Sequence, residues 1–276
     1  MSPTEPRELD CEVVETSLGA PAIRDRVTGE VMHPVVGPAI EASRLYVEPS
    51  RLATRLAAPD ERPLVLLDVG LGAGSNAIAA WRLSAAMPAT ARRLAIVSFD
   101  HSLGALALAL EHADRFGFEG DAGVAAHALL TDHHHETART SWSFVPGELP
   151  ATLAAAPLAD VVFWDPFSPK ANPSLWSTAA FSALRRVCRA GSTVHTYSGA
   201  TATRSALLLS GFAVGVGPST NAGKFGTLAA TDLETLAEPL DRRWLERLSR
   251  SSAAFPADAP TDALACVAAL PQFTPA

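Results

Sequence analysis

Short apolar runs alternate with amphipathic stretches between residues 60 and 230. Strands are predicted over 64–69, 94–99, 124–130, 161–164, 193–197, 212–216 and 225–229. The first five alternate with helical patterns, which is typical of a parallel sheet, whereas Gly and Pro between the last two predict an antiparallel hairpin. The pattern therefore predicts an α/β, Rossmann-like fold with a mostly parallel seven-stranded sheet.

Shorter patterns flank this domain on both sides. Residues 1–59 predict a small addition made of a hairpin within 12–36 and a helix over 37–56. The helix should break near Pro49, and its apolar side should contain Ile40, Leu45, Val47 and Leu52. Residues 231–276 predict a helix over 239–250 and an Ala/Pro-rich tail from Ser251. We therefore expect the main domain to span residues 60–230.

A glycine-rich loop follows the first strand. Asp68 lies near the end of that strand. Glycines follow at the alternate positions 70, 72 and 74, and Asn76 lies at the start of the next predicted helix. Alternate glycines let the backbone turn tightly and approach a ligand, while the helix start offers free N–H groups. The spacing G-x-G-x-G differs from the dinucleotide fingerprint G-x-G-x-x-G. The loop therefore predicts a nucleotide site of another kind.

A second acidic strand end supports this interpretation. Asp100 ends the second strand, where its carboxylate can accept hydrogen bonds from both hydroxyls of a ribose. Structural alternatives are a helix-facing cap for Asp68 and an N-cap for Asp100 at the helix beginning at Ser102. Two acids at consecutive strand ends, with the glycine loop between them, favour the ligand site.

The fourth strand ends in a third acid and a proline-rich segment. The segment reads D-x-F-x-P-x-x-N-P-x-x-W, with members Asp165, Phe167, Pro169, Asn172, Pro173 and Trp176. At the carboxyl edge of a parallel sheet it should lie beside the glycine loop, where ligands bind in such folds. Proline-stiffened turns after Asp165 predict a carboxylate held in place.

These motifs resemble those of a known family. The acid and glycine loop are similar to the first motif of S-adenosylmethionine-dependent methyltransferases. The Asp165 segment resembles the signature of the MnmC/MnmD family, which completes 5-methylaminomethyl-2-thiouridine at the tRNA wobble position. The resemblance covers roughly residues 18–230 and includes Tyr197-Ser198, Arg204, Gly211-Phe212 and Lys224.

The resemblance implies an S-adenosylmethionine-dependent N-methyltransferase acting on the aminomethyl group of a wobble 2-thiouridine in tRNA. Asp165 would be the catalytic residue, because a carboxylate can accept a hydrogen bond from the amine and orient its lone pair. The cofactor would be held by Asp68, Gly70, Gly72, Gly74, Asn76, Asp100 and Glu148. The substrate would be held by Phe167, Lys170, Asn172, Trp176, Tyr197 and Lys224.

Several features depart from the family or leave alternatives open. Trp176 could instead anchor the following helix in the core. Glu148 follows an unusual insertion over 131–141, and Asp100 replaces the more usual Glu. No FAD oxidase domain is found, so a separate oxidoreductase is expected to supply the aminomethyl precursor. Alternative functions are a small-molecule or protein amine methyltransferase of the same fold and a non-enzymatic cofactor-binding module.

Charge restricts the RNA hypothesis. The net charge of −7 argues against a chain that coats nucleic acid. Lys170 and Lys224 are the only two lysines among 22 basic residues, and both lie in loops already selected, where they could meet tRNA phosphates. Arginines at 185, 186 and 189 are more typical of a solvated helix face. Those at 242, 243, 247 and 250 could form a similar face or an RNA-facing stripe. An RNA substrate requires the basic residues to gather on the cofactor-side face.

Metal and membrane functions are not predicted. The three cysteines have no C-x-x-C spacing, and the adjacent histidines 133–135 cannot all face one ion, so we expect no metal and a polar surface loop. No apolar run approaches twenty residues, and the first residues lack the apolar region of a signal peptide. A cytoplasmic protein without a membrane segment is expected.

Overall fold

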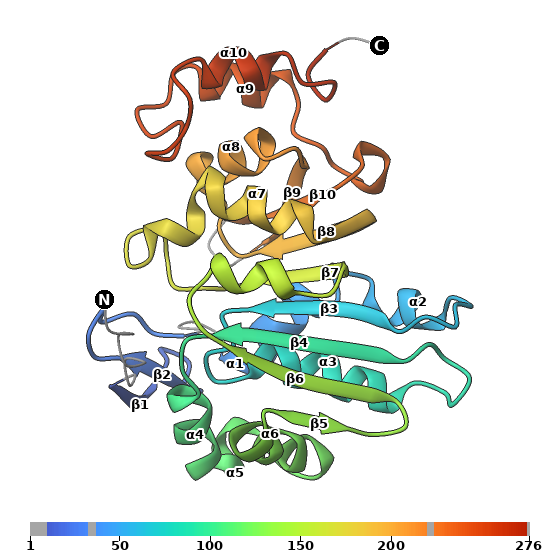
Figure 1. Ribbon diagram of the computed structural model, residues 1–276. Coiled ribbons are helices and arrows are strands. Elements are labelled where there is room, and N and C mark those ends of the chain that lie inside the picture. Colours follow the sequence, from blue (N-terminus) through green and yellow to red (C-terminus); the bar gives the residue numbers. More distant parts are fainter. Residues whose placement is uncertain (1–9, 33–36, 220–223, 275–276) are drawn as a thin grey trace.

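The computed structural model describes residues 10–32, 37–219 and 224–274. A mixed sheet lies at its centre, with strand order β5-β6-β4-β3-β7-β8-β10-β9 (Figure 1). Its strands are β3 (Leu64–Val69), β4 (Leu94–Asp100), β5 (His134–Glu136), β6 (Thr140–Pro146), β7 (Ala159–Trp164), β8 (Cys188–Thr196), β9 (Ala213–Ser219) and β10 (Phe225–Ala230).

The strand directions confirm the predicted fold class. Strands β6, β4, β3, β7 and β8 are parallel, and β10 pairs antiparallel with both β8 and β9. These seven strands form the Rossmann-like sheet, and the three-residue β5 adds an antiparallel edge beside β6. The carboxyl ends of the parallel strands share one edge of the sheet, where the site is expected.

The third parallel strand is not where the pattern placed it. Residues 124–130 lie in helix α6 (Asp121–Asp132), with Ala122, Ala125, Ala126 and Leu129 buried at helical spacing and Val124 58% exposed. The strand is β6, which begins inside the segment interpreted as an insertion. The histidine run forms most of β5 and is therefore not a loop: His133 contacts Phe144 and His135 contacts Trp81.

Alternation along the strands divides the core between the two faces of the sheet. Leu64 and Leu66 of β3 belong to one buried cluster, whereas Val65 and Leu67 belong to the other. The first face is covered by α3 (Ser75–Ala86), α4 (Gly104–Glu111), α5 (Ala113–Phe116) and α6, the second by α7 (Thr178–Arg186) and α8 (Thr201–Leu209). Short 3₁₀ turns are η2 (Ala151–Ala155) and η3 (Pro173–Trp176).

The N-terminal segment contains a hairpin and a broken helix, as predicted within the described residues. Strands β1 (Cys11–Glu15) and β2 (Pro21–Asp25) pair antiparallel beside the carboxyl ends of β3 and β4 (Figure 1). The helix consists of α1 (Pro38–Glu41), a π-helical turn η1 (Ala42–Val47) and α2 (Leu52–Ala57). Leu45, Val47 and Leu52 are buried, but Ile40 is 46% exposed, so its predicted core position is wrong. Residues 33–36 of the expected hairpin region lie outside the described residues.

The C-terminal segment packs on the edge strand of the sheet. It forms η4 (Leu233–Thr235), α9 (Arg242–Leu248) and α10 (Ala263–Ala268). The Gln272 side chain hydrogen-bonds to the backbone N–H and carbonyl of Val214 in β9, and Phe273 stacks on Trp244. The tail thus covers backbone groups that an open edge strand would expose.

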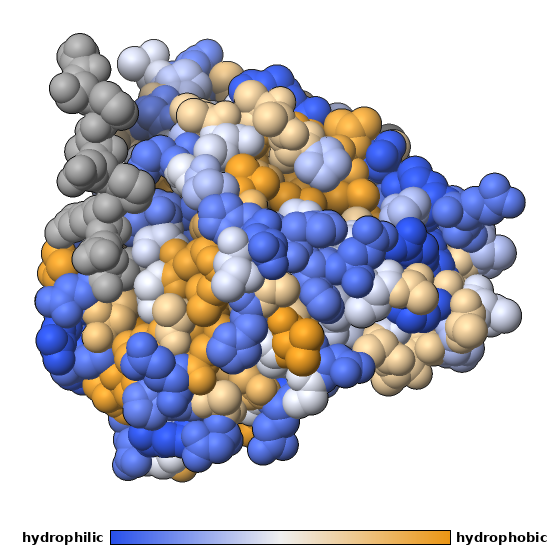
Figure 2. Space-filling model, turned by 60° about the horizontal axis from the view of Figure 1, so that its bottom comes forward, coloured by the Kyte–Doolittle hydropathy of each residue, from blue (hydrophilic) through white to orange (hydrophobic). Residues whose placement is uncertain are grey.

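The molecular surface mixes polar and apolar side chains. On the face turned forward in Figure 2, apolar residues form patches separated by hydrophilic ones. None of the described helices is long and apolar enough to cross a membrane. The three cysteines carry free thiols, of which Cys188 is buried and Cys266 exposed.

Candidate active site at the carboxyl edge of the sheet

A cavity of about 510 Å³ opens at the carboxyl ends of β3, β4 and β7. This volume lies within the range of small-molecule sites. The cavity brings together eight of the residues expected from the sequence, namely Gly70, Gly72, Asp100, Glu148, Asp165, Phe167, Asn172 and Tyr197. They come from five separate segments of the chain, which only the sheet topology unites.

The cavity lining is acidic. Five carboxylates, those of Glu30, Glu41, Asp100, Glu148 and Asp165, line it, and none of the described lining residues is Lys or Arg. Such a cavity favours cationic ligands over anionic ones. Among the described residues, those of the cavity included, no three His, Cys, Asp or Glu side chains are grouped so as to hold a metal ion.

Asp165 directly follows β7 and its carboxylate is held at both oxygens. The Asn76 side-chain amide donates to Oδ2 at 2.7 Å, and the Tyr46 hydroxyl donates to Oδ1 at 2.5 Å. Asn76 belongs to the first turn of α3 and is buried, so its side chain connects the glycine-loop helix with Asp165. Asn76 does not line the cavity, and its contact with a cofactor would be indirect.

Asp100 is oriented by its neighbours at the end of β4. Its Oδ2 accepts a hydrogen bond from the Gly72 N–H at 3.0 Å, and its Oδ1 accepts one from the His101 N–H at 2.7 Å. The His101 imidazole lies 2.9 Å from the same Oδ1. The hydrogen bond with Asp100 raises the pKa of His101, although partial burial opposes the rise. Apart from its position directly after Asp100, nothing in the sequence marks His101 as a residue of the site.

The glycine loop approaches the Asp165 segment too closely for a side chain. A Cβ at Gly70 would lie 2.7 Å from the carbonyl oxygen of Asp165 and 2.8 Å from the Pro166 Cα, and Gly70 has φ +86°. A Cβ at Gly72, where φ is +51°, would lie 3.1 Å from the Met32 sulfur. The loop thus exposes bare backbone to the cavity, which fits a closely held nucleotide or methionine group.

Asp68 and Gly74 flank the glycine loop in the sequence, and neither lines the cavity. Asp68 is 1% exposed, and the Ser98 hydroxyl donates to its Oδ2 at 2.7 Å. The Trp142 indole N–H donates to the same Ser98 oxygen. Gly74 starts α3 with φ +81°. These two residues could therefore affect ligand binding only indirectly, through the conformation of the glycine loop.

Of the predicted substrate residues, Phe167, Asn172 and Tyr197 line the cavity, whereas Trp176 does not. Trp176 is 3% exposed, packs against Phe181 and Tyr197, and donates its indole N–H to the Phe167 carbonyl at 2.8 Å. This position corresponds to the core-anchor alternative and argues against direct substrate contact.

Both lysines are exposed, but neither lines the cavity. Lys170 lies in the segment after Asp165, and Lys224 directly precedes β10. The residue before Lys224, Gly223, lies outside the described residues. Lys170 therefore lies between two lining residues, Ser168 and Asn172, whereas no described lining residue follows Tyr197 in the sequence and Lys224 lies beyond it.

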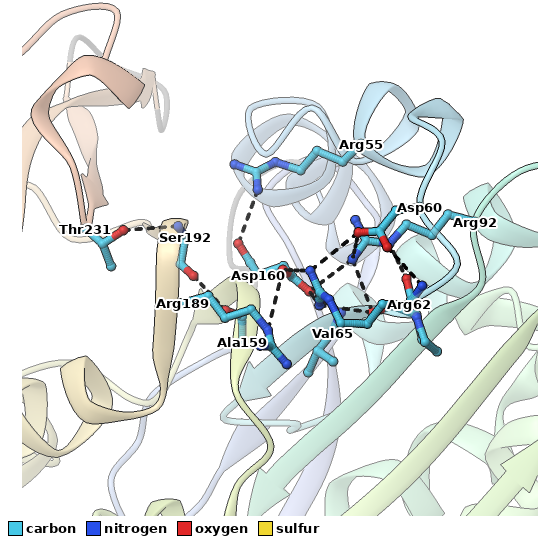
Figure 3. A network of polar contacts seen from close by, with 11 residues as sticks. Arg55, Asp60, Arg62, Val65, Arg92, Ala159, Asp160, Arg189, Ser192 and Thr231 are labelled. Atoms are coloured by element: carbon cyan, nitrogen blue, oxygen red, sulfur yellow. Dashed lines mark hydrogen bonds and ion pairs between the residues drawn. The ribbon is translucent and has the colours of Figure 1, made fainter.

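Many arginines lie at the opposite, amino edge of the sheet (Figure 3). Asp160, near the start of β7, accepts from Arg62 at 2.8 and 3.0 Å and lies 3.6 Å from Arg92. Burial alone would raise the pKa of Asp160, but hydrogen bonds from Arg62 and Val65 and the nearby cations lower it. These arginines bind a structural carboxylate at the amino edge. They are therefore not among the basic residues that an RNA substrate would require at the cofactor-side edge.

Two tyrosines, Tyr46 and Tyr197, line the cavity. Burial, followed by the charge of Asp165, raises the pKa of both Tyr46 and Tyr197 above the ordinary value. Both hydroxyls therefore stay protonated and act as donors, Tyr46 to Asp165 and Tyr197 to the Pro166 carbonyl at 3.0 Å. The sequence assigned no role to Tyr46, although it is one of only two tyrosines in the chain.

Comparisons with known proteins agree with this geometry. A family model described as S-adenosyl-L-methionine-dependent methyltransferase matches residues 130–232. The crystal structure of MnmC2 from Aquifex aeolicus is 25% identical, with a TM-score of 0.71 over 96% of this chain and 87% of that chain. Spermidine synthase from Thermotoga maritima, 12% identical with a TM-score of 0.50 over 95% of this chain and 81% of that chain, shares the fold alone.

Two curated relatives carry the name tRNA 5-methylaminomethyl-2-thiouridine biosynthesis bifunctional protein MnmC. The protein from Burkholderia vietnamiensis is 30% identical over 72% of this chain and 32% of its own length. The protein from Methylibium petroleiphilum is 29% identical over 78% of this chain and 34% of its own length. The chain thus spans about a third of the length of these relatives.

The sheet topology, the glycine loop and the family match define an S-adenosyl-L-methionine-dependent methyltransferase of Rossmann-like fold. Within this class, the chain is related to MnmC and corresponds to the methyltransferase part of those proteins.

Proposed function

We propose that this methyltransferase transfers a methyl group to the nitrogen of an aminomethyl substituent on a tRNA wobble 2-thiouridine. The observation that carries the proposal is the position of Asp165, whose fixed carboxylate lies in the same cavity as the glycine loop. The names of the MnmC relatives support the tRNA substrate.

The described residues suit S-adenosylmethionine. Gly70 and Gly72 would admit its methionine part, Asp100 would accept hydrogen bonds from its ribose hydroxyls, and Glu148 follows β6 where it could meet the adenine amino group. When bound, the cofactor supplies an electrophilic methyl group on a sulfonium. The carboxylates of the lining favour this cationic ligand.

Asp165 would act by orientation and charge. Its carboxylate would accept a hydrogen bond from the neutral amine, direct the nitrogen lone pair toward the methyl group, and stabilise the ammonium formed as the new N–C bond replaces the C–S bond. The excess proton then leaves to solvent. Phe167 and Tyr197 offer aromatic surfaces at the cavity against which an unstacked base could pack.

The macromolecular substrate would be held outside the cavity. Lys170 and Lys224 are exposed and could meet tRNA phosphates, which the acidic lining would not accept. The aminomethyl precursor would have to come from another activity, which we expect to be an oxidoreductase. We expect the protein to act in the cytoplasm, together with its tRNA.

A second candidate is methylation of a small-molecule or protein amine. The specific observation in its favour is that five carboxylates and no described Lys or Arg side chain line the cavity, which would suit any compact cationic amine.

The test uses tRNA from a strain without the gene, incubated with S-adenosylmethionine and the purified full chain. We expect mass analysis of the wobble nucleoside to show addition of one methyl group, and Asp165→Asn to lower the rate by at least about a hundredfold. Asp114→Asn, an exposed change in α5, is the matched control. Unmethylated tRNA together with methylated small amines would favour the second candidate. Full activity of Asp165→Asn would refute the role of Asp165.

A further inference from the structure

We infer that Tyr46, from the N-terminal segment, is a positioning residue that fixes the orientation of the Asp165 carboxylate for the incoming amine. The inference rests on the proposed function of Asp165. It extends the site to a part of the chain that lies 119 residues before Asp165.

Two fixed donors determine how this carboxylate lies. The Tyr46 hydroxyl binds Oδ1 at 2.5 Å and the Asn76 amide binds Oδ2 at 2.7 Å, so each oxygen is held from a different element. A carboxylate on a short side chain with one donor could still turn about its terminal bond, whereas two donors leave one orientation. Because Asp165 lines the cavity, this orientation decides how its carboxylate meets an incoming amine.

The local structure around Tyr46 is suited to this role. Tyr46 lies in the π-helical turn η1, a local irregularity that is frequent at functional sites. Its side chain is fully buried, and its ring lies 5.3 Å from the ring of Phe163, which is in the strand that leads into Asp165. The hydroxyl is therefore held relative to β7 by ring packing as well as by its own hydrogen bond.

The N-terminal hairpin holds the same segment at a second point. Glu30 accepts hydrogen bonds from the Ser168 N–H, at 2.9 Å, and from the Ser168 hydroxyl. Residues on both sides of Asp165 are thus tied down: Phe163 packs on Tyr46, and Ser168 binds Glu30. Two residues of the N-terminal segment, Tyr46 and Glu30, therefore hold the chain on either side of the carboxylate.

The chemistry of the donors distinguishes this carboxylate from a structural one. Asp160, on the same strand, is bound by the guanidinium of Arg62, which neutralises its charge. Tyr46 and Asn76 are uncharged donors, so these two bonds orient Asp165 without neutralising its negative charge.

The test compares wild type with Tyr46→Phe, which removes the hydroxyl and keeps the ring that packs on Phe163. We expect kcat for amine methylation to fall by about ten- to a hundredfold, while the KM for S-adenosylmethionine changes by less than about twofold. Ser50→Ala is the control: the Ser50 hydroxyl is also buried in this segment but bonds to the Val47 carbonyl, so its loss should leave kcat unchanged.

A second readout does not depend on activity. The titration of the Asp165 carboxyl, followed by carbon-13 NMR and assigned with Asp165→Asn, should move to higher pH in Tyr46→Phe, because a donor that favours the ionised form is lost. Tyr197, on which the charge of Asp165 also acts, stays protonated because burial raises its pKa.

The outcomes separate the two proposals. A wild-type chain that methylates no amine would refute the proposed function, and the titration would still report on the contact with Tyr46. An active wild type with unchanged kcat and unchanged titration in Tyr46→Phe would overturn the positioning role alone. Loss of folding or of S-adenosylmethionine binding in parallel with activity would also overturn it, in favour of a purely structural role.

Discussion

Replacing Gly70 by alanine should disrupt the contact between the glycine loop and the Asp165 segment. The added Cβ would meet the carbonyl oxygen of Asp165 at 2.7 Å, whereas ordinary van der Waals contact begins at 3.4 Å. The obstacles are backbone atoms, which cannot rotate away, so the two segments must separate by roughly 0.7 Å.

The expected magnitude has two components. Gly70 has φ +86°, and a non-glycine residue in the left-handed region costs about 1–2 kcal/mol. Overpacking against a fixed neighbour adds about 1–3 kcal/mol. Because the displaced segment contains Asp165, a shift of this size should also lower kcat by about a hundredfold.

Gly19→Ala is a matched control for the backbone component. Gly19 has φ +78° in the turn between β1 and β2, and a Cβ there would meet nothing within 4 Å. Urea unfolding of both variants should show a larger loss of stability in Gly70→Ala, and only this variant should lose methyltransferase activity. Two results together would refute the steric argument: the two variants lose the same stability, and Gly70→Ala keeps its activity within about twofold of wild type.

Three further predictions concern charge. Asp160→Asn should lower the free energy of unfolding by about 2 kcal/mol at neutral pH, because its arginine partners lose a charged acceptor. Because the folded-state pKa of Asp160 is lowered, this difference should be fully present above the ordinary value of 3.8 and should be lost in unfolding experiments as the pH falls through the lower folded-state pKa. The pKa of His101 is raised by Asp100, so the pair stabilises the fold below pH 6.5 and loses this effect as the pH rises through the folded-state pKa. The stability lost in His101→Asn should therefore be largest in mildly acidic solution, and a difference that grows toward alkaline pH would contradict this sign. Lys170→Ala combined with Lys224→Ala should weaken tRNA binding and reduce the slope of log affinity against log salt by about two; an unchanged slope would place the phosphates elsewhere.

The sequence was sufficient for most of the sheet, because its strands are short, apolar and bounded by turn residues. It failed at residues 124–130, because a short apolar run can be a strand or part of a buried helix, and the helix preference of its alanines was not weighed. The burial of Ala122, Ala125 and Leu129 reveals the helical period. The true strand β6 was missed because Thr140, Ser141 and Ser143 make it polar between its buried aromatic residues.

The candidate site could be predicted wherever a residue follows a parallel strand. Asp100 and Asp165 share the cavity because carboxyl ends of parallel strands meet at one edge. Tyr46 and Glu30 could not be placed in this way, since the position of the N-terminal segment depends on tertiary packing and no strand register relates it to the sheet.

The arginine network around Asp160 has a consequence for how molecules approach the enzyme. It places guanidinium groups at the sheet edge opposite the cavity, while the described lining residues of the cavity include acids but no Lys or Arg. The two edges of the sheet therefore differ in their charged side chains, and the carboxylates of the cavity favour a cation there and disfavour a phosphate. At physiological ionic strength the field of these carboxylates decays over about 8 Å. Under the proposed function, the tRNA therefore has to extend its amine-bearing base into the cavity while its phosphates stay beyond this distance from the lining carboxylates.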